Sequence, residues 1–265
     1  MVAPLAARGV TAEPRVWDDA SVDWRGYELV VIRSTWDYAD RRDEYLRWCA
    51  SLPRVLNALP VLTANTDKIY LRELAVAGIA VVPTTWIEPR ADAAAVALPD
   101  GELVVKPAVS AGALRTTRHS AGSAATARQR IDELLAEGRV VMVQPYLAAV
   151  DRHGEAGLIF FNGALSHAFR KGPLLRPDDN ATSGLWAPEQ ITPWQPAPDE
   201  LALADATLDA LPWPRSELLY ARIDVVRDTN NAPLVLEVEL TEPSLYMRMS
   251  DGAAERFAEA ISARL

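Results

Sequence analysis

Cysteine, histidine and long hydrophobic runs are all scarce in this chain. The one cysteine, Cys49, has no partner for an intrachain disulfide, so no disulfide framework is expected. The three histidines, His119, His153 and His167, are scattered without the spacing of a metal site. No apolar run is long enough to cross a bilayer, and the N-terminus has no signal-peptide pattern. The cytoplasm is therefore the expected location.

Basic side chains are also outnumbered. The 265 residues contain 27 Lys and Arg against 36 Asp and Glu, which gives a net charge of −9. This balance argues against a general nucleic-acid or anionic-membrane surface, although a local basic pocket is compatible with it. With 49% hydrophobic and 24% charged residues, the chain has the composition of an ordinary globular protein with one to three lobes.

Strands and helices are predicted to alternate in the first third of the chain. A buried strand is expected at Glu28–Ile32, an amphipathic helix at "RRDEYLRWCASL" and a second helix over about Thr66–Ala77. Gly78 follows this helix as a natural C-terminal cap. A strand at Ala80–Trp86 continues the alternation, which indicates an α/β lobe.

The remainder is predicted to be richer in strands. "LVVK", ending at Lys106, and "VVMVQP", ending at Pro145, have the apolar character of buried strands. Asn162-Gly163 is the strongest local hairpin signal. The other expected elements are a helix at about Ala124–Glu137, a long Pro- and Trp-bearing loop over 172–198, a helix at about Asp199–Leu211 and a helix from 251 to 265. A loop of that length inside a domain is often functional.

Two glutamates interrupt the apolar strand in "LVLEVELTEPSL", residues 234–245. A hairpin with the preceding strand "YARIDVVRD", turning at "TNNA", would place Asp224 opposite Glu237. The same register sets Arg222 opposite Glu239, on the same face. One explanation is a solvent-exposed polar face with an Arg–Glu pair. The other is a Mg²⁺ or Mn²⁺ site, because hard carboxylate oxygens suit these ions and leave positions for phosphate oxygens.

Several residues could handle a phosphate, although each is unremarkable alone. Lys68 is expected in the first turn of its helix, where a cation opposes the helix dipole. Lys106 ends a strand, and the small residues of "AVSAGA" after it could fold their N–H groups around an anion. Gln144 and Tyr146 follow a buried strand. Alternatively, Lys68 is an exposed lysine, Lys106 is a charge at a strand edge, and Gln144 and Tyr146 mark a plain strand end. Neither a G-x-x-x-x-G-K-[ST] nor a G-x-G-x-x-G motif is present.

The order of these features resembles the ATP-grasp superfamily over about residues 60–250. The resemblance implies that the two lysines contact the nucleotide phosphates, that 110–113 closes as a lid and that adenine lies against 144–147. The nucleotide contacts that it implies are Lys68, Lys106, Ser110, Ala111, Gly112, Ala113, Gln144, Pro145, Tyr146, Leu147 and Lys171.

The resemblance also implies a metal site and catalytic residues. Asp224, Glu237 and Glu239 would bind Mg²⁺, with two ions expected and Mn²⁺ as an alternative. Arg222 and Lys106 would stabilise charge in the transition state. Many relatives have Asn at the position of Glu239, so this chain carries one more negative charge there.

"VIRSTWDY", "QPYL", "GALSHAFRK" and "ELTEPSL" are similar to a narrower, glutathione-synthetase-like branch that includes the cyclo-ligase of D-cycloserine biosynthesis. The resemblance implies an ATP-grasp fold of class α/β, with α+β lobes. Three parts are expected, namely an N-terminal lobe over 1–62, a central subdomain with the lid over 63–146 and a C-terminal subdomain with the metal hairpin over 147–265. "MVAPLAARGV" is predicted to be the first helix of the N-terminal lobe, whose usual opening strand is missing.

The function implied is ATP- and Mg²⁺-dependent C–N ligation. A carboxylate, or a ureido or carbamoyl oxygen, of a small amino-acid-like substrate would be activated as an acyl phosphate and attacked by an amine, between two molecules or within one. The alternatives are a small-molecule kinase and a nucleotide-binding regulatory module. The expected partners are ATP and this substrate, without nucleic acid or membrane, and a homodimer is compatible with the sequence.

The substrate is expected beyond the strand in "ELVVIRSTWDY", because ligands bind at the carboxyl ends of strands in open α/β sheets. Arg33 offers a fork for a carboxylate, Trp36 an apolar wall and Asp37 an anion for an amine. Alternatively, Arg33 pairs with Asp37 and Trp36 is core, in which case the substrate lies at the 172–198 loop. The resemblance adds three further substrate contacts, which are Ser34, Arg170 and Ser244.

Overall fold

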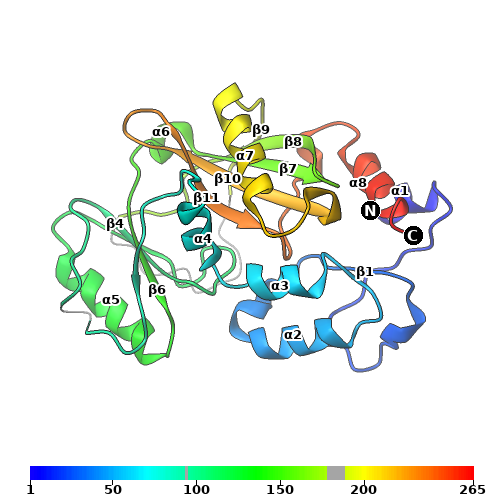
Figure 1. The fold of residues 1–265 in the computed structure, drawn as a ribbon, viewed down its shortest axis with the longest axis horizontal. Helices are drawn as coiled ribbons and strands as arrows, with labels where there is room; N and C mark the ends of the chain where they lie inside the picture. The colour runs from blue at the N-terminus through cyan, green and yellow to red at the C-terminus, as the bar shows by residue number, and fades with distance from the viewer. Residues whose placement is uncertain (93–94, 178–188) are drawn as a thin grey trace.

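Three β-sheets organise the described residues of the computed structural model, 1–92, 95–177 and 189–265 (Figure 1). A two-stranded sheet comes first, a four-stranded sheet follows, and a five-stranded sheet completes the chain. Each sheet has its own helices, as expected for a mixed α/β chain. No helix in the described part of the chain is both long and apolar enough to cross a membrane.

The two-stranded sheet pairs β1 (Val30–Val31) with β2 (Val55–Leu56) in parallel. The strand expected at Glu28–Ile32 is shorter, because only Val30 and Val31 have paired partners in the second strand. The core beside it is aromatic, and Tyr45 is fully buried in it together with Cys49. Its helices are η1 (Trp24–Gly26), η2 (Trp36–Asp40), α2 (Arg42–Ser51) and α3 (Leu59–Asn65).

The four-stranded sheet has the order β3-β6-β4-β5, with every neighbouring pair antiparallel. Helix α5 covers one face through Ala127, Ile131 and Leu134, which pack on the strands (Figure 1). Its elements are β3 (Thr85–Ile87), β4 (Leu103–Pro107), β5 (Thr117–His119), α5 (Ala124–Ala136) and β6 (Val141–Pro145).

The five-stranded sheet has the antiparallel order β11-β10-β7-β8-β9. Helices α4 and α7 contribute to the core on one face, and Phe257 of α8 packs in a second core with the ring of Tyr220. Its elements are α4 (Tyr70–Val76), α6 (Val150–His153), β7 (Glu155–Phe161), β8 (Ala164–Lys171), β9 (Ile191–Trp194), α7 (Pro198–Ala210), η4 (Arg215–Glu217), β10 (Tyr220–Arg227), β11 (Pro233–Glu239), η5 (Met247–Met249) and α8 (Ala253–Ser262).

The first helix, α1 (Val2–Ala6), lies beside the last helix of the chain. It packs against α8, and Leu5 is buried in the core with Phe257 (Figure 1). The prediction of a helix at the start of the chain is confirmed, and the core around Leu5 includes Phe257 of α8 together with Val31 of β1 and Leu56 of β2.

Helix boundaries differ from the prediction around Lys68. The helix expected over Thr66–Ala77 begins at Tyr70, and a separate helix, α3, precedes it. Lys68 therefore lies in the connection between the two helices and does not oppose a helix dipole. Gly78 has φ of +86°, as predicted for the residue after the cap.

Two other segments also differ from expectation. Within the predicted strand at Ala80–Trp86, only the last residues pair in the four-stranded sheet. The Val82 amide donates to the Val235 carbonyl of β11, and the Ala80 carbonyl accepts from the Val235 amide. Part of the predicted loop over 172–198 forms the edge strand β9, and residues 178–188 of that loop lie outside the described residues. The Asn162-Gly163 hairpin is confirmed, with φ of +49° and +80° at the two turn residues.

Candidate active site

A cavity of about 220 Å³ lies where the four-stranded and five-stranded sheets face each other. Apolar side chains form part of its wall, namely Val82, Val104, Leu147, Leu174, Leu175, Val226 and Leu236. Charged side chains form another part, namely Lys68, Lys106, Glu155, Lys171, Glu189, Arg222, Asp224, Glu237, Glu239 and Glu242. Such a combination suits a ligand with one apolar and one strongly charged part.

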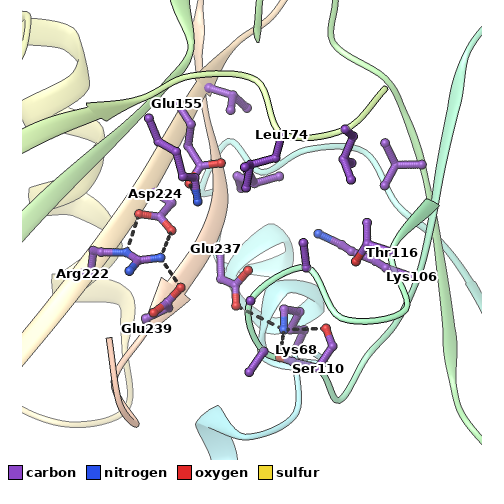
Figure 2. Close-up of a pocket in the computed structure, with 18 of the residues that line it drawn as sticks. Lys68, Lys106, Ser110, Thr116, Glu155, Leu174, Arg222, Asp224, Glu237 and Glu239 are labelled. Atoms are coloured by element: carbon purple, nitrogen blue, oxygen red, sulfur yellow. Dashed lines mark hydrogen bonds and ion pairs between the residues drawn. The ribbon is translucent and has the colours of Figure 1, made fainter. Parts of the chain in front are cut away.

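Strand alternation brings Lys106 to this cavity. Leu103 and Val105 of β4 pack on α5, so Val104 and Lys106 point to the other face. Lys106 is only 7% exposed, and it forms no hydrogen bond or ion pair within residues 1–92, 95–177 and 189–265. Burial lowers the pKa of its amine to about 8. Figure 2 shows Lys106 across the cavity from the acidic hairpin.

Lys68 is held by the docking of two helices on the edge of β11. Tyr70 donates its hydroxyl to the Val238 carbonyl at 2.8 Å, and Asn65 donates to the same carbonyl at 2.7 Å. The chain between these residues therefore lies along β11. Lys68 Nζ donates to the Ser110 carbonyl at 2.6 Å and lies 3.1 Å from Glu237 Oε1 (Figure 2). It thus joins the acidic hairpin to the predicted lid.

The predicted lid, 110–113, lines the cavity along its whole length. Ser110 is buried against Lys68, and Ala111 packs against the aromatic core beside the two-stranded sheet. Gly112 and Ala113 have φ of +58° and +60°. These left-handed conformations favour small residues, which agrees with the composition of the loop.

Lys171 forms a buried pair with Glu155. The two residues face each other on β8 and β7, and Lys171 Nζ lies 2.7 Å from Glu155 Oε1. Burial alone would lower the pKa of Lys171, but the negative charges of Glu155 and Asp224 raise it overall. Lys171 is therefore a fixed cation of the cavity wall.

The acidic hairpin has the predicted register. Asp224 is paired with Glu237, and Arg222 with Glu239. Arg222 donates to both oxygens of Asp224, at 2.8 and 2.7 Å, and also to Glu239 (Figure 2). Burial raises the pKa of Glu239 to about 8, although Arg222 opposes this shift.

The three predicted metal ligands lie together but are paired with cations. Asp224 and Glu239 contact Arg222, and Glu237 contacts Lys68. Among the described residues, no group of three or more His, Cys, Asp or Glu side chains is arranged around a common point as a metal site would require. The role of these carboxylates as metal ligands stays a prediction.

The predicted adenine-binding segment, Gln144–Leu147, lines the cavity where β6 ends. Gln144 donates to Thr84 Oγ1 at 2.9 Å, which fixes its side chain. The guanidinium of Arg118 lies 3.4 Å from the centre of the Tyr146 ring, and the Tyr146 hydroxyl donates to Asp151 at 2.6 Å. Pro145 lies between these two anchored residues. The segment is therefore well positioned without a ligand.

The predicted substrate residues are dispersed. Trp36 and Ser244 line the cavity, whereas Ser34 is exposed. Arg33 is not part of the lining, but it donates to the Pro243 carbonyl at 2.6 Å, beside the cavity. Burial lowers the pKa of Arg33.

Two substrate predictions do not agree with the geometry. Asp37 is turned to the aromatic core, where it accepts from the Trp17 indole at 3.0 Å and pairs with Arg41 at 3.2 Å. Arg170 precedes Lys171 on β8, so it points to the opposite face, where its guanidinium stacks 3.4 Å from the centre of the Trp194 ring. Neither residue lines the cavity.

Several lining residues were not predicted. Glu155 and Glu242 are the most prominent, because both are buried carboxylates. Tyr38, Thr116 and Tyr246 also line the cavity. The only signal for Glu242 was its place in "ELTEPSL", and the only signal for Glu155 was a charge at the start of an apolar strand.

The fold matches solved ATP-grasp ligases. The ligase PsnB in complex with a minimal precursor superimposes with a TM-score of 0.61 at 18% identity, covering 100% of this chain and 94% of that one. The D-alanine–D-alanine ligase from Bacillus anthracis gives 0.59 at 15% identity, over 81% of this chain and 71% of the ligase. The architecture is therefore the ATP-grasp fold, as the order of the sequence features suggested.

The relationship to one enzyme is much stronger. The cycloserine biosynthesis protein DcsG from Streptomyces lavendulae is 38% identical over 273 residues, which cover 97% of this chain and 90% of the relative. A crystal structure of D-cycloserine synthetase DcsG superimposes with a TM-score of 0.88 at 36% identity, over 99% of this chain and 92% of that one. Residues 1–59 match the model of the N-terminal domain of D-cycloserine synthetase DcsG. The chain belongs to the DcsG family, and it is an ATP-dependent ligase that forms C–N bonds.

Proposed function

We propose that this ligase activates the carboxylate of a small amino-acid-like substrate as an acyl phosphate, using ATP bound in the cavity. The observation that carries the proposal is Lys106. A buried lysine without an anionic partner is unfavourable, so its retention in the cavity wall indicates that a ligand supplies the anion. The phosphate chain of ATP is such a ligand.

The nucleotide position follows from the two kinds of lining. Val104 and Leu236 offer an apolar slot for a base beside the strand end at Gln144–Leu147. Lys106 and Lys171 then face the phosphates, with the lid over 110–113 nearby. In this arrangement Lys68, which donates to the Ser110 carbonyl, would also contact the phosphates.

A divalent cation fits the acidic hairpin. Glu237 and Glu239 reach the cavity with hard oxygen donors, and a divalent cation beside them would offset the repulsion between their charges. Mg²⁺ is the ion we propose there with Asp224, with two ions and Mn²⁺ as an alternative. When bound, it would neutralise charge on the phosphates.

The chemistry has two steps. A substrate carboxylate oxygen attacks the γ-phosphorus, the bond to ADP breaks, and an acyl phosphate forms. An amine then attacks the acyl carbon, loses a proton, and expels phosphate. Lys106 stabilises charge on the transferring group, and Arg222, fixed by two bonds to Asp224, stabilises the oxyanion. Lid closure over 110–113 would keep water from the acyl phosphate.

The proposed product is a cyclic amide. The closely similar relative is a D-cycloserine synthetase, and D-cycloserine is a cyclic hydroxamate, that is, an internal amide whose nitrogen is also bonded to the side-chain oxygen. A ligase that closes this ring joins a carboxyl carbon to a nitrogen of the same molecule. If the substrate carries a ureido group instead of a free amine, the activated oxygen could be that of the ureido carbonyl.

Assignments of the predicted domains and the location are part of the same proposal. The segments 1–62, 63–146 and 147–265 would act as an N-terminal lobe, a lid-bearing subdomain and a metal-bearing subdomain. The cytoplasm is the proposed location, since ATP is the co-substrate.

An isotope experiment tests the mechanism directly. A substrate labelled with heavy oxygen in its carboxylate should transfer one labelled oxygen to the phosphate released with ADP. Transfer of label from a ureido oxygen would select the other form of activation. Release of ADP without a new C–N bond, with label retained in a phosphorylated product, would show a kinase and overturn the proposal. Phosphate release by Lys106→Met under the same conditions serves as the background.

A further inference from the structure

After β11, the backbone carbonyls of the chain accept hydrogen bonds from side chains that are distant in the sequence. Asn57 donates to the Leu240 carbonyl at 2.7 Å. The Tyr220 hydroxyl donates to the Thr241 carbonyl at 2.7 Å. The first of these side chains belongs to the N-terminal part of the fold, so the position of this segment depends on how that part docks.

Two arginines fix the next residues. Arg33 donates to the Pro243 carbonyl at 2.6 Å, and Arg222 donates to the Ser244 carbonyl at 3.2 Å. The segment 240–244 is therefore anchored on both sides of Glu242. Anchored backbone of this kind presents a side chain in a defined direction.

Glu242 is the residue that these anchors leave without a partner. It lines the cavity and is only 6% exposed, yet within the described residues it forms no hydrogen bond or ion pair. Burial and the charge of Glu239 raise the pKa of Glu242, although Arg222 and Arg33 oppose the shift. A buried carboxylate without a donor is costly, so a donor that arrives with a ligand would be bound strongly.

The missing donor is better explained by an ammonium group than by a second metal ion. A metal ion needs several ligands around one point, and the carboxylates that the proposed Mg²⁺ would use are those of the hairpin, Asp224, Glu237 and Glu239. An ammonium needs only one carboxylate and a few further acceptors. Asp37, which the sequence suggested for this task, is occupied by Trp17 and Arg41.

We propose that Glu242 binds the α-ammonium group of the amino-acid substrate. This inference rests on the proposed function, because it assigns the substrate of that same cavity. A carboxylate partner also keeps this amine protonated and therefore not nucleophilic. The cavity would thus distinguish the amine that is only recognised from the nitrogen that attacks the acyl phosphate.

The test measures binding and not turnover, with probes that differ only in the amine. D-cycloserine and D-serine carry the amine, and the isoxazolidinone ring without the amino group and hydroxypropanoate are their amine-free counterparts. Titration calorimetry with Mg²⁺ and a non-hydrolysable ATP analogue gives the dissociation constants for the wild type, for Glu242→Gln and for Glu88→Gln. Glu88 is an exposed glutamate outside the cavity, paired with Arg72, and serves as the matched control.

The expected result is selective for the amine. In Glu242→Gln, the dissociation constants of the amine-bearing probes should rise roughly tenfold to a hundredfold, because a charge-assisted bond is lost. Those of the amine-free probes should stay the same, and Glu88→Gln should match the wild type throughout. Equal weakening of both kinds of probe, or no preference of the wild type for the amine-bearing probes, would overturn the assignment.

Two further readouts separate this proposal from its alternatives. The apparent Mg²⁺ affinity should not change in Glu242→Gln, and a weaker Mg²⁺ affinity would make Glu242 a metal ligand instead. Without ligands, Glu242→Gln should unfold at a higher temperature than the wild type, since it removes an unpaired buried charge, and a lower temperature would show that Glu242 is structural. Failure of the nucleotide analogue to bind the wild type would refute the proposed function, whereas the amine comparison alone addresses Glu242.

Discussion

Lys106→Met should make the protein more stable and a poorer binder of ATP at the same time. Lys106 is buried in the cavity wall with no partner among the described residues, so its charge is unfavourable until an anion binds. Methionine has a similar length and flexibility, so the substitution removes the charge without opening a large cavity.

The gain in stability can be derived from the pKa. A fall from 10.5 to about 8, caused mainly by burial, corresponds to on the order of 3 kcal/mol of destabilisation while the amine is charged in both states. Below about pH 8 this penalty is present in full. As the pH rises from about 8 to 10.5, the folded protein loses the proton that the unfolded chain still holds, and the penalty disappears. The advantage of Lys106→Met should therefore shrink over that range.

The loss of affinity comes from the charge-assisted contact to phosphate. Such a contact contributes roughly 1.5–3 kcal/mol, so the dissociation constant of a non-hydrolysable ATP analogue should rise about tenfold to a hundredfold. Isothermal titration at pH 7 measures this value. Urea denaturation of the same protein, without nucleotide, measures the stability.

Lys171→Met is the matched comparison, because Lys171 is also a buried lysine of the same cavity but is paired with Glu155. Its removal leaves the Glu155 carboxylate buried without a cation, and stability should fall by about 3 kcal/mol. The two lysines should thus shift stability in opposite directions while both weaken nucleotide binding. If Lys106→Met is destabilised as much as Lys171→Met, or binds the analogue as tightly as the wild type, the assignment of Lys106 to phosphate is refuted.

Other variants test the remaining roles. Glu237→Gln should abolish turnover and weaken Mg²⁺-supported ATP binding. Unchanged activity of this variant at an ordinary Mg²⁺ concentration would show that Glu237 is not a metal ligand. Lys68→Met should weaken ATP binding by about tenfold or more, since it loses a charge-assisted contact; unchanged affinity would limit Lys68 to its bonds with Ser110 and Glu237. Arg33→Ala should raise the KM for the amino-acid substrate with ATP affinity nearly unchanged, and a loss of stability with unaltered kinetics would make Arg33 structural.

The acidic hairpin shows how far the sequence could predict this site. Alternating apolar and acidic residues placed Glu237 and Glu239 on one face, and a symmetric turn aligned them with Asp224 and Arg222. The register changes by one residue at a bulge beside Asp224, so the pairs nearer the turn differ from the prediction while those at the cavity agree. Alternation is a local property of a strand, which explains why it was readable without a structure.

The pairing of Glu155 with Lys171 could not be predicted in the same way. A tight turn at Asn162-Gly163 sets Phe161 opposite Ala164, and continuing that register would pair Glu155 with Arg170. A bulge near Phe160 moves the partner by one residue and turns Arg170 to the other face. No sequence signal marks this bulge, so the direction of the Arg170 side chain, away from the cavity, could not be predicted.

The contacts of Asp37 could not be predicted for a different reason, which is that they include a residue from another part of the chain. Asp37 follows the end of β1, as expected for a residue that contacts a ligand. Its carboxylate, however, accepts a hydrogen bond from the Trp17 indole and pairs with the Arg41 guanidinium. Trp17 is distant in the sequence from this segment, and its contact is set by the packing of an aromatic core. Tertiary contacts of this kind cannot be derived from local patterns.

The buried charges of the cavity fall into two groups with different consequences. Lys171 and Arg222 are held in pairs, and such pairs fix geometry before a ligand arrives. Lys106 and Glu242 carry opposite charges and have no ion-pair partner among the described residues, and each reduces the stability of the protein without ligands. A ligand that is anionic in its phosphates and cationic in its amino group would satisfy both. Both unpaired charges therefore lower the stability of the protein without ligands, and both are neutralised when nucleotide and amino acid bind together. This neutralisation favours binding of the two ligands that the ligation reaction requires.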